Sequence, residues 1–117
     1  MANPNIVNVA TINGNTAVQA VGTSATAIVT NAAASGKIYK VNLLIVSNID
    51  GTSSAESTAD LYRSSTVYHI AKTVVVPADA SLDVLSKPLY LLEGDALRLT
   101  ANATGDLEAV CSFEEIS

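Results

Sequence analysis

The sequence contains no tryptophan, one phenylalanine, one histidine and one cysteine among its 117 residues. A single cysteine excludes an internal disulfide and suits assembly in a reducing cytosol. One histidine and one cysteine cannot supply the tetrahedral ligand set of a structural zinc site. The six glycines are isolated, so no phosphate-binding loop is present. We therefore expect no disulfide framework, no zinc centre and no cofactor.

Basic residues are also scarce. The chain has six Lys and Arg against eleven Asp and Glu, and its net charge is −5. Because nucleic acids and anionic membranes both require clustered positive charge, neither is an expected partner. No apolar run approaches the ~20 residues that span a bilayer. The first five residues lack the basic and apolar regions of a signal peptide, so we expect no secretion signal.

Catalytic motifs are missing as well. A serine or cysteine nucleophile needs a base beside it, and the only histidine, His69, lies inside a predicted strand. Cys111 falls on the apolar face of the last strand, where a thiol behaves as a small hydrophobe. We expect no catalytic residue and no metal site. A cation held by loop carboxylates is the alternative, although none has EF-hand spacing: Asp50 with Glu56, Asp79 with Asp83, and Glu93 with Asp95.

The sequence is instead rich in valine and threonine, which pack well on a pleated sheet. In residues 37–50 the apolar side chains recur every second residue, which predicts a central strand. Its expected inward face carries Tyr39, Val41, Leu43, Ile45 and Ile49. Leu43→Ala should then cost about 2–5 kcal/mol. The outward residues Ile38, Leu44 and Val46 are too apolar to face water, so we expect another segment or subunit to cover them.

Similar alternation recurs along the rest of the chain between short turns. Leu97 and Leu99 are expected inward, and Gly94 is expected to adopt a positive φ. In the last strand one face carries Leu107, Ala109, Cys111 and Phe113, and Val110 is the one apolar residue opposite. This spacing predicts seven or eight strands and no helix, which is typical of an all-β antiparallel β-sandwich or jelly roll. We assign residues 25–117 to one such domain.

Residues 1–24 differ from the rest because they contain no charged side chain. Asn13 and Gly14 suit a type I′ turn, which would fold residues 12–18 into a hairpin. Three interpretations remain open. The segment is an arm that pairs with a neighbouring subunit, or it is the first strand or hairpin of the sandwich, or simply a loose terminus.

Several short motifs carry a resemblance to a known group of proteins: Ser47-Asn-Ile-Asp-Gly51, Asp60-Leu-Tyr62, Tyr68-His-Ile-Ala-Lys72, Val75-Val-Pro-Ala78, Leu92-Glu-Gly-Asp95 and Phe113-Glu-Glu-Ile116. The chain resembles small β-sandwich virion proteins of tailed bacteriophages, particularly the marine, cyanophage-like group. These motifs are turn and strand signatures, so the resemblance transfers no active-site residue. It implies a non-enzymatic structural protein of the virion, assembled in many copies in the host cytoplasm.

Within that group we expect a capsid decoration or cement protein. The expected partners are copies of itself, with a homotrimer favoured, and other virion proteins such as the major capsid protein. The alternatives are a neck, tail or fibre component and a carbohydrate- or receptor-binding module, with Tyr62 and Tyr68 as a contact patch. The candidate interface residues are Ile6, Val7, Val9, Ile12, Ile38, Leu44, Val46, Tyr62 and Tyr68.

Overall fold

The structure is a computed structural model that describes residues 7–117, and within them it contains nine β-strands and no helix. The strands are β1 (Ile12–Ala20), β2 (Thr26–Thr30), β3 (Ile38–Asn48), β4 (Ala55–Arg63), β5 (Thr66–Val76), β6 (Ser81–Asp83), β7 (Leu89–Leu91), β8 (Ala96–Ala101) and β9 (Leu107–Ile116). The predicted all-β fold is confirmed. The expected count of seven or eight strands is too low, because two short strands, β6 and β7, pair with opposite ends of β3.

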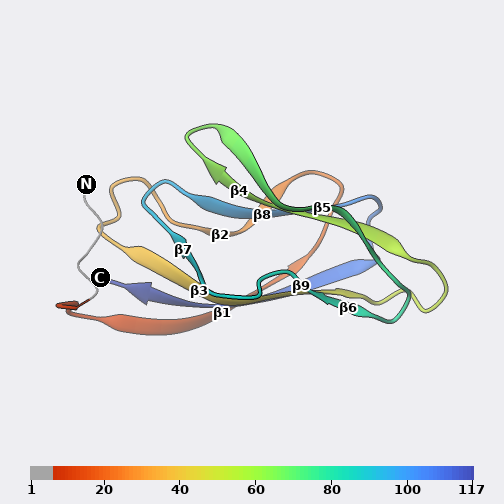
Figure 1. Cartoon of the computed structure of the whole chain (residues 1–117), viewed down its shortest axis with the longest axis horizontal. Coiled ribbons are helices and arrows are strands. Elements are labelled where there is room, and N and C mark those ends of the chain that lie inside the picture. Colours follow the sequence, from red (N-terminus) through yellow and green to blue (C-terminus); the bar gives the residue numbers. More distant parts are fainter. Residues whose placement is uncertain (1–6) are drawn as a thin grey trace.

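Two antiparallel sheets form the layers of a sandwich (Figure 1). Sheet A has the order β1-β9-β3-β6, with β7 also paired to β3, and sheet B has the order β2-β8-β4-β5. The chain crosses between the sheets at every connection except β4 to β5 and β6 to β7. As a result, the first and last strands of the sequence, β1 and β9, are neighbours in sheet A.

Leucine and valine side chains from both sheets fill the core. Leu44, Val46 and Leu107 come from sheet A, and Val76, Leu97 and Leu99 come from sheet B. Burial of each such side chain contributes roughly 1.5–3 kcal/mol to folding. The inward positions predicted for β8 and β9 are confirmed, with Phe113 half-buried and stacked on Tyr39 at 5.5 Å between ring centroids.

A β-bulge reverses the faces of β3 along its length. Strand β3 pairs with β9 from Ile38 to Asn48, and the register shifts once, between Val41 and Leu43. One extra residue moves every later side chain to the opposite face. Leu44 and Val46 are therefore fully buried, whereas Leu43 and Ile45 lie on the outer face and are half-buried. The predicted faces are correct up to Val41 and wrong beyond it, where Ile49 is also exposed.

Residues 12–20 form one continuous strand, and the hairpin predicted around Asn13 and Gly14 does not form. Strand β1 pairs with β9 at nine successive positions, from Ile12↔Ile116 to Ala20↔Glu108. A full-length partner strand makes straight pairing more favourable than a local turn. Gly94, by contrast, has the expected positive φ of 86°.

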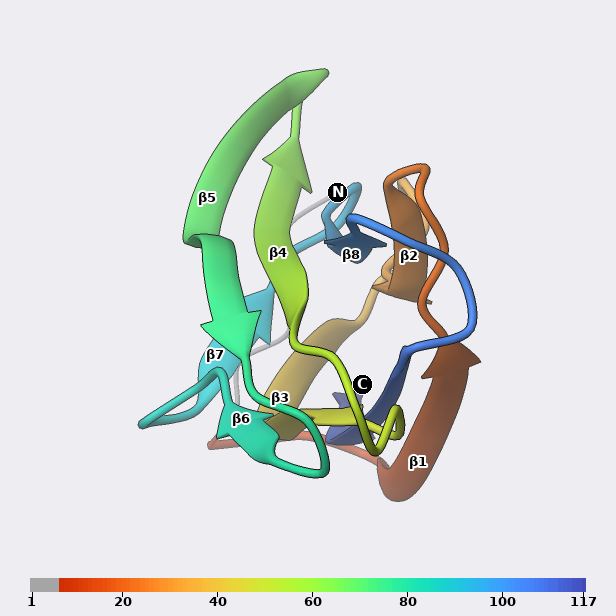
Figure 2. The same cartoon turned by 90° about the vertical axis from the view of Figure 1, so that its right-hand side faces the viewer.

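The β4–β5 hairpin curves away from the rest of sheet B (Figure 2). Its two central turn residues, Ser64 and Ser65, have φ values of 51° and 59°, which are the positive values of a type I′ turn. Strand β5 shifts register twice against β4, and Thr73 beside the first shift also has a positive φ. These bulges increase the local twist and bend the strand.

Candidate assembly surfaces

The residues with potential for chemistry do not converge. No group of three or more His, Cys, Asp or Glu in residues 7–117 is placed to hold a metal ion. His69 is exposed on β5, opposite Asp60 of β4. Cys111 lies in the core, where burial raises the pKa of its thiol to about 11. The thiol is therefore neutral and inaccessible near neutral pH.

The outer face of sheet A carries a row of apolar side chains that crosses three strands. Cross-strand pairing aligns Val18 of β1 with Val110 of β9, and Val110 with Ile45 of β3. Leu43 lies on the same face of β3. The exposed fractions are 75% for Val18 and 42% for Val110. We call these four residues, Val18, Leu43, Ile45 and Val110, the apolar stripe.

Small neutral side chains border the apolar stripe. Thr16 and Ser112 are paired on one side of it, and on the other the hydroxyls of Ser47 and Ser81 lie 3.0 Å apart. Three carboxylates also reach this margin: Glu114 accepts a hydrogen bond from Asn42 Nδ2 at 2.8 Å, Glu108 lies between Ala20 and Ser47, and Asp83 is paired with Ile45. An apolar centre with a polar margin is the arrangement found in protein–protein interfaces.

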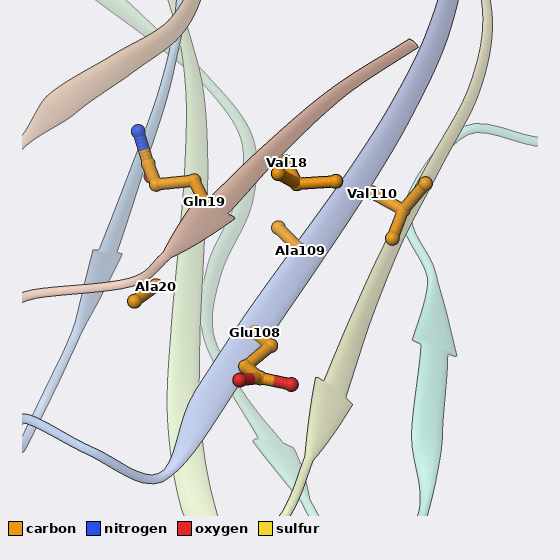
Figure 3. Close-up of a pocket in the computed structure, with 6 residues that line it drawn as sticks. All are labelled: Val18, Gln19, Ala20, Glu108, Ala109 and Val110. Atoms are coloured by element: carbon orange, nitrogen blue, oxygen red, sulfur yellow. The ribbon is translucent and has the colours of Figure 1, made fainter.

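A depression of about 260 Å³ lies at one end of the stripe, where β1 and β9 run side by side (Figure 3). Its lining is aliphatic apart from one amide and one carboxylate: Val18, Gln19, Ala20, Glu108, Ala109 and Val110. None of these residues is a nucleophile with a general base beside it. The depression can accept an apolar side chain of a partner but offers no group for catalysis.

The outer face of sheet B is different, because a buried ion pair occupies it. Arg98 Nε donates to Asp60 Oδ1 at 2.9 Å, and the Asp60 side chain is only 3% exposed. The Arg98 guanidinium also lies 4.0 Å from the ring centroid of Tyr62. Tyr62 is therefore engaged within its own sheet by a cation–π contact.

The structure separates the interface residues expected from the sequence. Leu44 and Val46 belong to the core and Ile38 is buried, so these three are not available to a partner. Val7 and Ile12 are exposed, Val9 is half-buried, and Ile6 lies outside the described residues.

The expected tyrosine patch does not form. Leu61 pairs with Tyr68, and Tyr62 pairs with Val67, so the two tyrosines point to opposite faces of the hairpin. Tyr68 is 55% exposed, whereas Tyr62 lies against Arg98. The two side chains cannot share one contact surface.

Sequence reasoning missed the apolar stripe. Val110 gave a signal, because it is the one apolar residue on the polar side of the last strand. Leu43 and Ile45 gave no signal, because neither Gly nor Pro at positions 42 and 43 marks the bulge that turns them outward. Val18 lies in the uncharged segment 1–24, where no alternation with charged residues distinguishes one face from the other.

Comparison with known proteins yields a similar fold and no family. No family model matches the chain, and no curated protein matches it significantly. A chain from Bacillus endospore appendages, which form a novel family of disulfide-linked pili, superposes with a TM-score of 0.54 at 15% identity. The match covers 92% of this chain and 87% of that one. At this identity the similarity shows a shared β-sandwich fold alone.

Within the described residues, no helix is long and apolar enough to cross a membrane.

Proposed function

We propose that this chain is a non-enzymatic structural subunit of a tailed-phage virion that decorates or cements the capsid. The observation that carries the proposal is the apolar stripe on the outer face of sheet A, led by Val18 and Val110. Exposed apolar side chains in a row mark a surface that another protein covers. The resemblance of the turn motifs to phage virion proteins supplies the kind of particle.

The strand order supports the same proposal. When β6 and β7 are counted as one interrupted strand, eight strands form two four-stranded sheets, 1-9-3-6 and 2-8-4-5. We infer from this order, and from the repeated crossing between sheets, that the fold is a jelly roll, an architecture of viral capsid proteins. The similar endospore chain comes from appendages that form disulfide-linked pili. Disulfide linkage is not proposed here, because Cys111 is buried.

The subunit would lie with sheet A against the particle and sheet B toward solvent. On the outer face of sheet B, the charges of Asp60 and Arg98 are satisfied by each other, so neither residue needs a partner from outside the chain. The centre of the apolar stripe is neutral, and the carboxylates of Asp83, Glu108 and Glu114 stand at its margin. Docking the centre of the stripe therefore buries no charge when these carboxylates stay at the solvated rim of the interface.

Protein quantification in purified particles of the encoding phage tests the proposal. A capsid decoration subunit should be present in hundreds of copies, whereas about a dozen or fewer would indicate a neck, tail or fibre component. Absence of the chain from the particles would contradict the virion proposal.

A matched pair of variants tests the surface. Purified protein should co-sediment with particles that lack it, and Val110→Asp should lower that binding about tenfold or more by placing charge in the stripe. The control is Val75→Asp, which changes an exposed valine on sheet B and should bind normally. Equal loss in both variants, with circular dichroism unchanged, would exclude the stripe as the docking surface.

A receptor-binding module is the second candidate, and Tyr68 on the curved β4–β5 hairpin favours it. An exposed tyrosine on a projecting hairpin is a common contact residue for sugars and proteins. Binding of the isolated domain to a glycan array, lost in Tyr68→Ala, would support this alternative. An array without signal would remove its glycan form.

A further inference from the structure

We propose that two copies of this chain pair through the free edges of their β1 strands, in an antiparallel arrangement about a two-fold axis at Asn15. Sheet A of one copy then continues into sheet A of the other. The inference deepens the proposed function, on which it rests for its biological purpose, by naming a second copy as the partner and β1 as the contact.

The backbone of β1 presents a full row of unpaired groups. Thr11 N–H donates to the Ser117 carbonyl at 3.0 Å, and Ser117 N–H donates back to the Thr11 carbonyl at 2.9 Å. In an antiparallel ladder such pairs recur at every second residue, and Val21 N–H to the Leu107 carbonyl, 2.9 Å, continues the series. The alternate residues therefore direct N–H and C=O to the open edge: Ile12, Gly14, Thr16, Val18 and Ala20, all of them exposed.

The other edges of the sandwich carry features that prevent pairing, and β1 carries none. Strand β5 has two register shifts and Lys72, β2 has five residues and one shift, and β6 and β7 have three residues each. Bulges, charges and short length are the usual protections of an edge strand. Strand β1 has nine residues in unbroken register, with no charge and no proline. Among the edges formed by residues 7–117, this long one alone lacks such protection and can accept another strand.

The sequence of β1 favours a second copy of itself as the occupant. With Asn15 opposite Asn15 of the second copy, Ile12 faces Val18, and Gly14 faces Thr16. Ile12 and Val18 are the two most exposed large apolar residues of the strand. In this register each Ile12 packs beside the Val18 of the other copy, so both residues are covered in both copies. A centre at Thr16 would place Ile12 opposite Ala20 and Val18 opposite Gly14, and would cover less apolar surface.

Charge and symmetry agree with this partner. A chain of net charge −5 repels its own copies, but β1 itself is uncharged, so the paired strands add no charge of their own to that repulsion. The two-fold axis is perpendicular to the paired sheets, which leaves both apolar stripes on the same side. One dimer could thus lie on a single underlying surface. A two-fold pair differs from the trimer expected from the sequence.

Sedimentation of the purified full-length chain over about 1 µM to 1 mM tests the pairing. The wild type should associate reversibly to twice its mass of 12.0 kDa. Val18→Lys places a charge opposite Ile12 of the second copy and should weaken association about tenfold or more. The control Val75→Lys alters an exposed valine of β5 and should associate as the wild type does. Circular dichroism checks that both variants fold.

A cysteine at the symmetry axis tests the register. Residues opposite each other in a non-hydrogen-bonded pair have Cα atoms about 4.5 Å apart, within the range of a disulfide. Asn15→Cys should therefore form a disulfide-linked dimer on mild oxidation, and the exposed loop control Ser54→Cys should not. The native Cys111 is buried and cannot contribute.

A wild type that stays monomeric, with no cross-link above the control, would overturn the inference and leave the particle test of function untouched. Association that Val18→Lys does not weaken would place the dimer on another surface and overturn it equally. Association that Val18→Lys weakens while Asn15→Cys forms no cross-link would mean that another segment occupies the edge. That outcome overturns symmetric pairing.

Discussion

The two long edge strands, β1 in sheet A and β5 in sheet B, differ in how far they are protected against pairing with another strand. Strand β5 is bent by two bulges, carries Lys72 and closes with a tight serine turn, so its free edge is irregular. Strand β1 is regular and uncharged, and the outer face beside it carries the apolar stripe. One sandwich thus has a protected side and an open side. Assembly through sheet A requires this asymmetry, whereas a solitary monomer would gain from protecting both edges.

The largest expected effect concerns which side of β3 is interior. Leu44→Ala should cost about 2–5 kcal/mol, because Leu44 is fully buried among core side chains. Leu43→Ala should cost about 1 kcal/mol or less, because Leu43 lies half-buried on the outer face. Urea unfolding of the two variants measures the difference. Equal costs, or a larger cost at Leu43, would mean that Leu43 lies in the core and not in the apolar stripe on the outer face.

The next effect contrasts the ion pairs of the two sheets. Arg98→Met leaves the Asp60 carboxylate, with a side chain 3% exposed, without its partner and should cost about 3 kcal/mol. Lys37→Met removes the more exposed pair between Lys37 and Glu115, 3.1 Å apart, and should cost clearly less, because solvent screens that pair. Chemical denaturation of both variants at neutral pH compares them. Similar losses would mean that the charges of sheet B are not buried as described.

The smallest effect concerns the turn that closes the protected edge. Ser64 and Ser65 both adopt positive φ, which costs energy for residues other than Gly, Asn and Asp. Replacing the pair by Asn-Gly should stabilise the protein by about 0.5–1 kcal/mol and raise the melting temperature by a few degrees. The reversed order, Gly-Asn, is the matched control and should gain less. A loss of stability in the Asn-Gly variant would contradict the type I′ geometry.

The sequence supports much of the fold because a two-residue period needs only local information. Leu97, Leu99 and the inward residues of β9 follow from alternation alone, and Gly94 follows from its need for a positive φ. The β3 bulge could not be predicted, because it depends on how β3 meets β9 and neither Gly nor Pro marks it. A shift of one residue there places Leu44 and Val46 in the core and turns Leu43 and Ile45 to the outer face.

The candidate surface was predictable only in part. Asn13 and Gly14 are a strong local turn signal, but a partner strand nine residues long overrides it. Tyr62 and Tyr68 are close in sequence, yet a two-residue turn places them on opposite faces. Val18 acquires its significance from its neighbour Val110, which lies 92 positions later in the sequence (110 − 18). Contacts of this range are set by topology and not by local pattern.

Amide hydrogen exchange of the wild type at low and high protein concentration tests the central claim most directly. The amides of Gly14, Thr16 and Val18 point to the open edge of β1 and should become protected as concentration rises. The amides of Val67 and His69, which alternate with the paired positions of the β5 edge, should exchange quickly at every concentration. Protection that appears at β1 alone is the predicted result. Equal exchange at both edges, unchanged by concentration, would contradict an open, assembling side of sheet A.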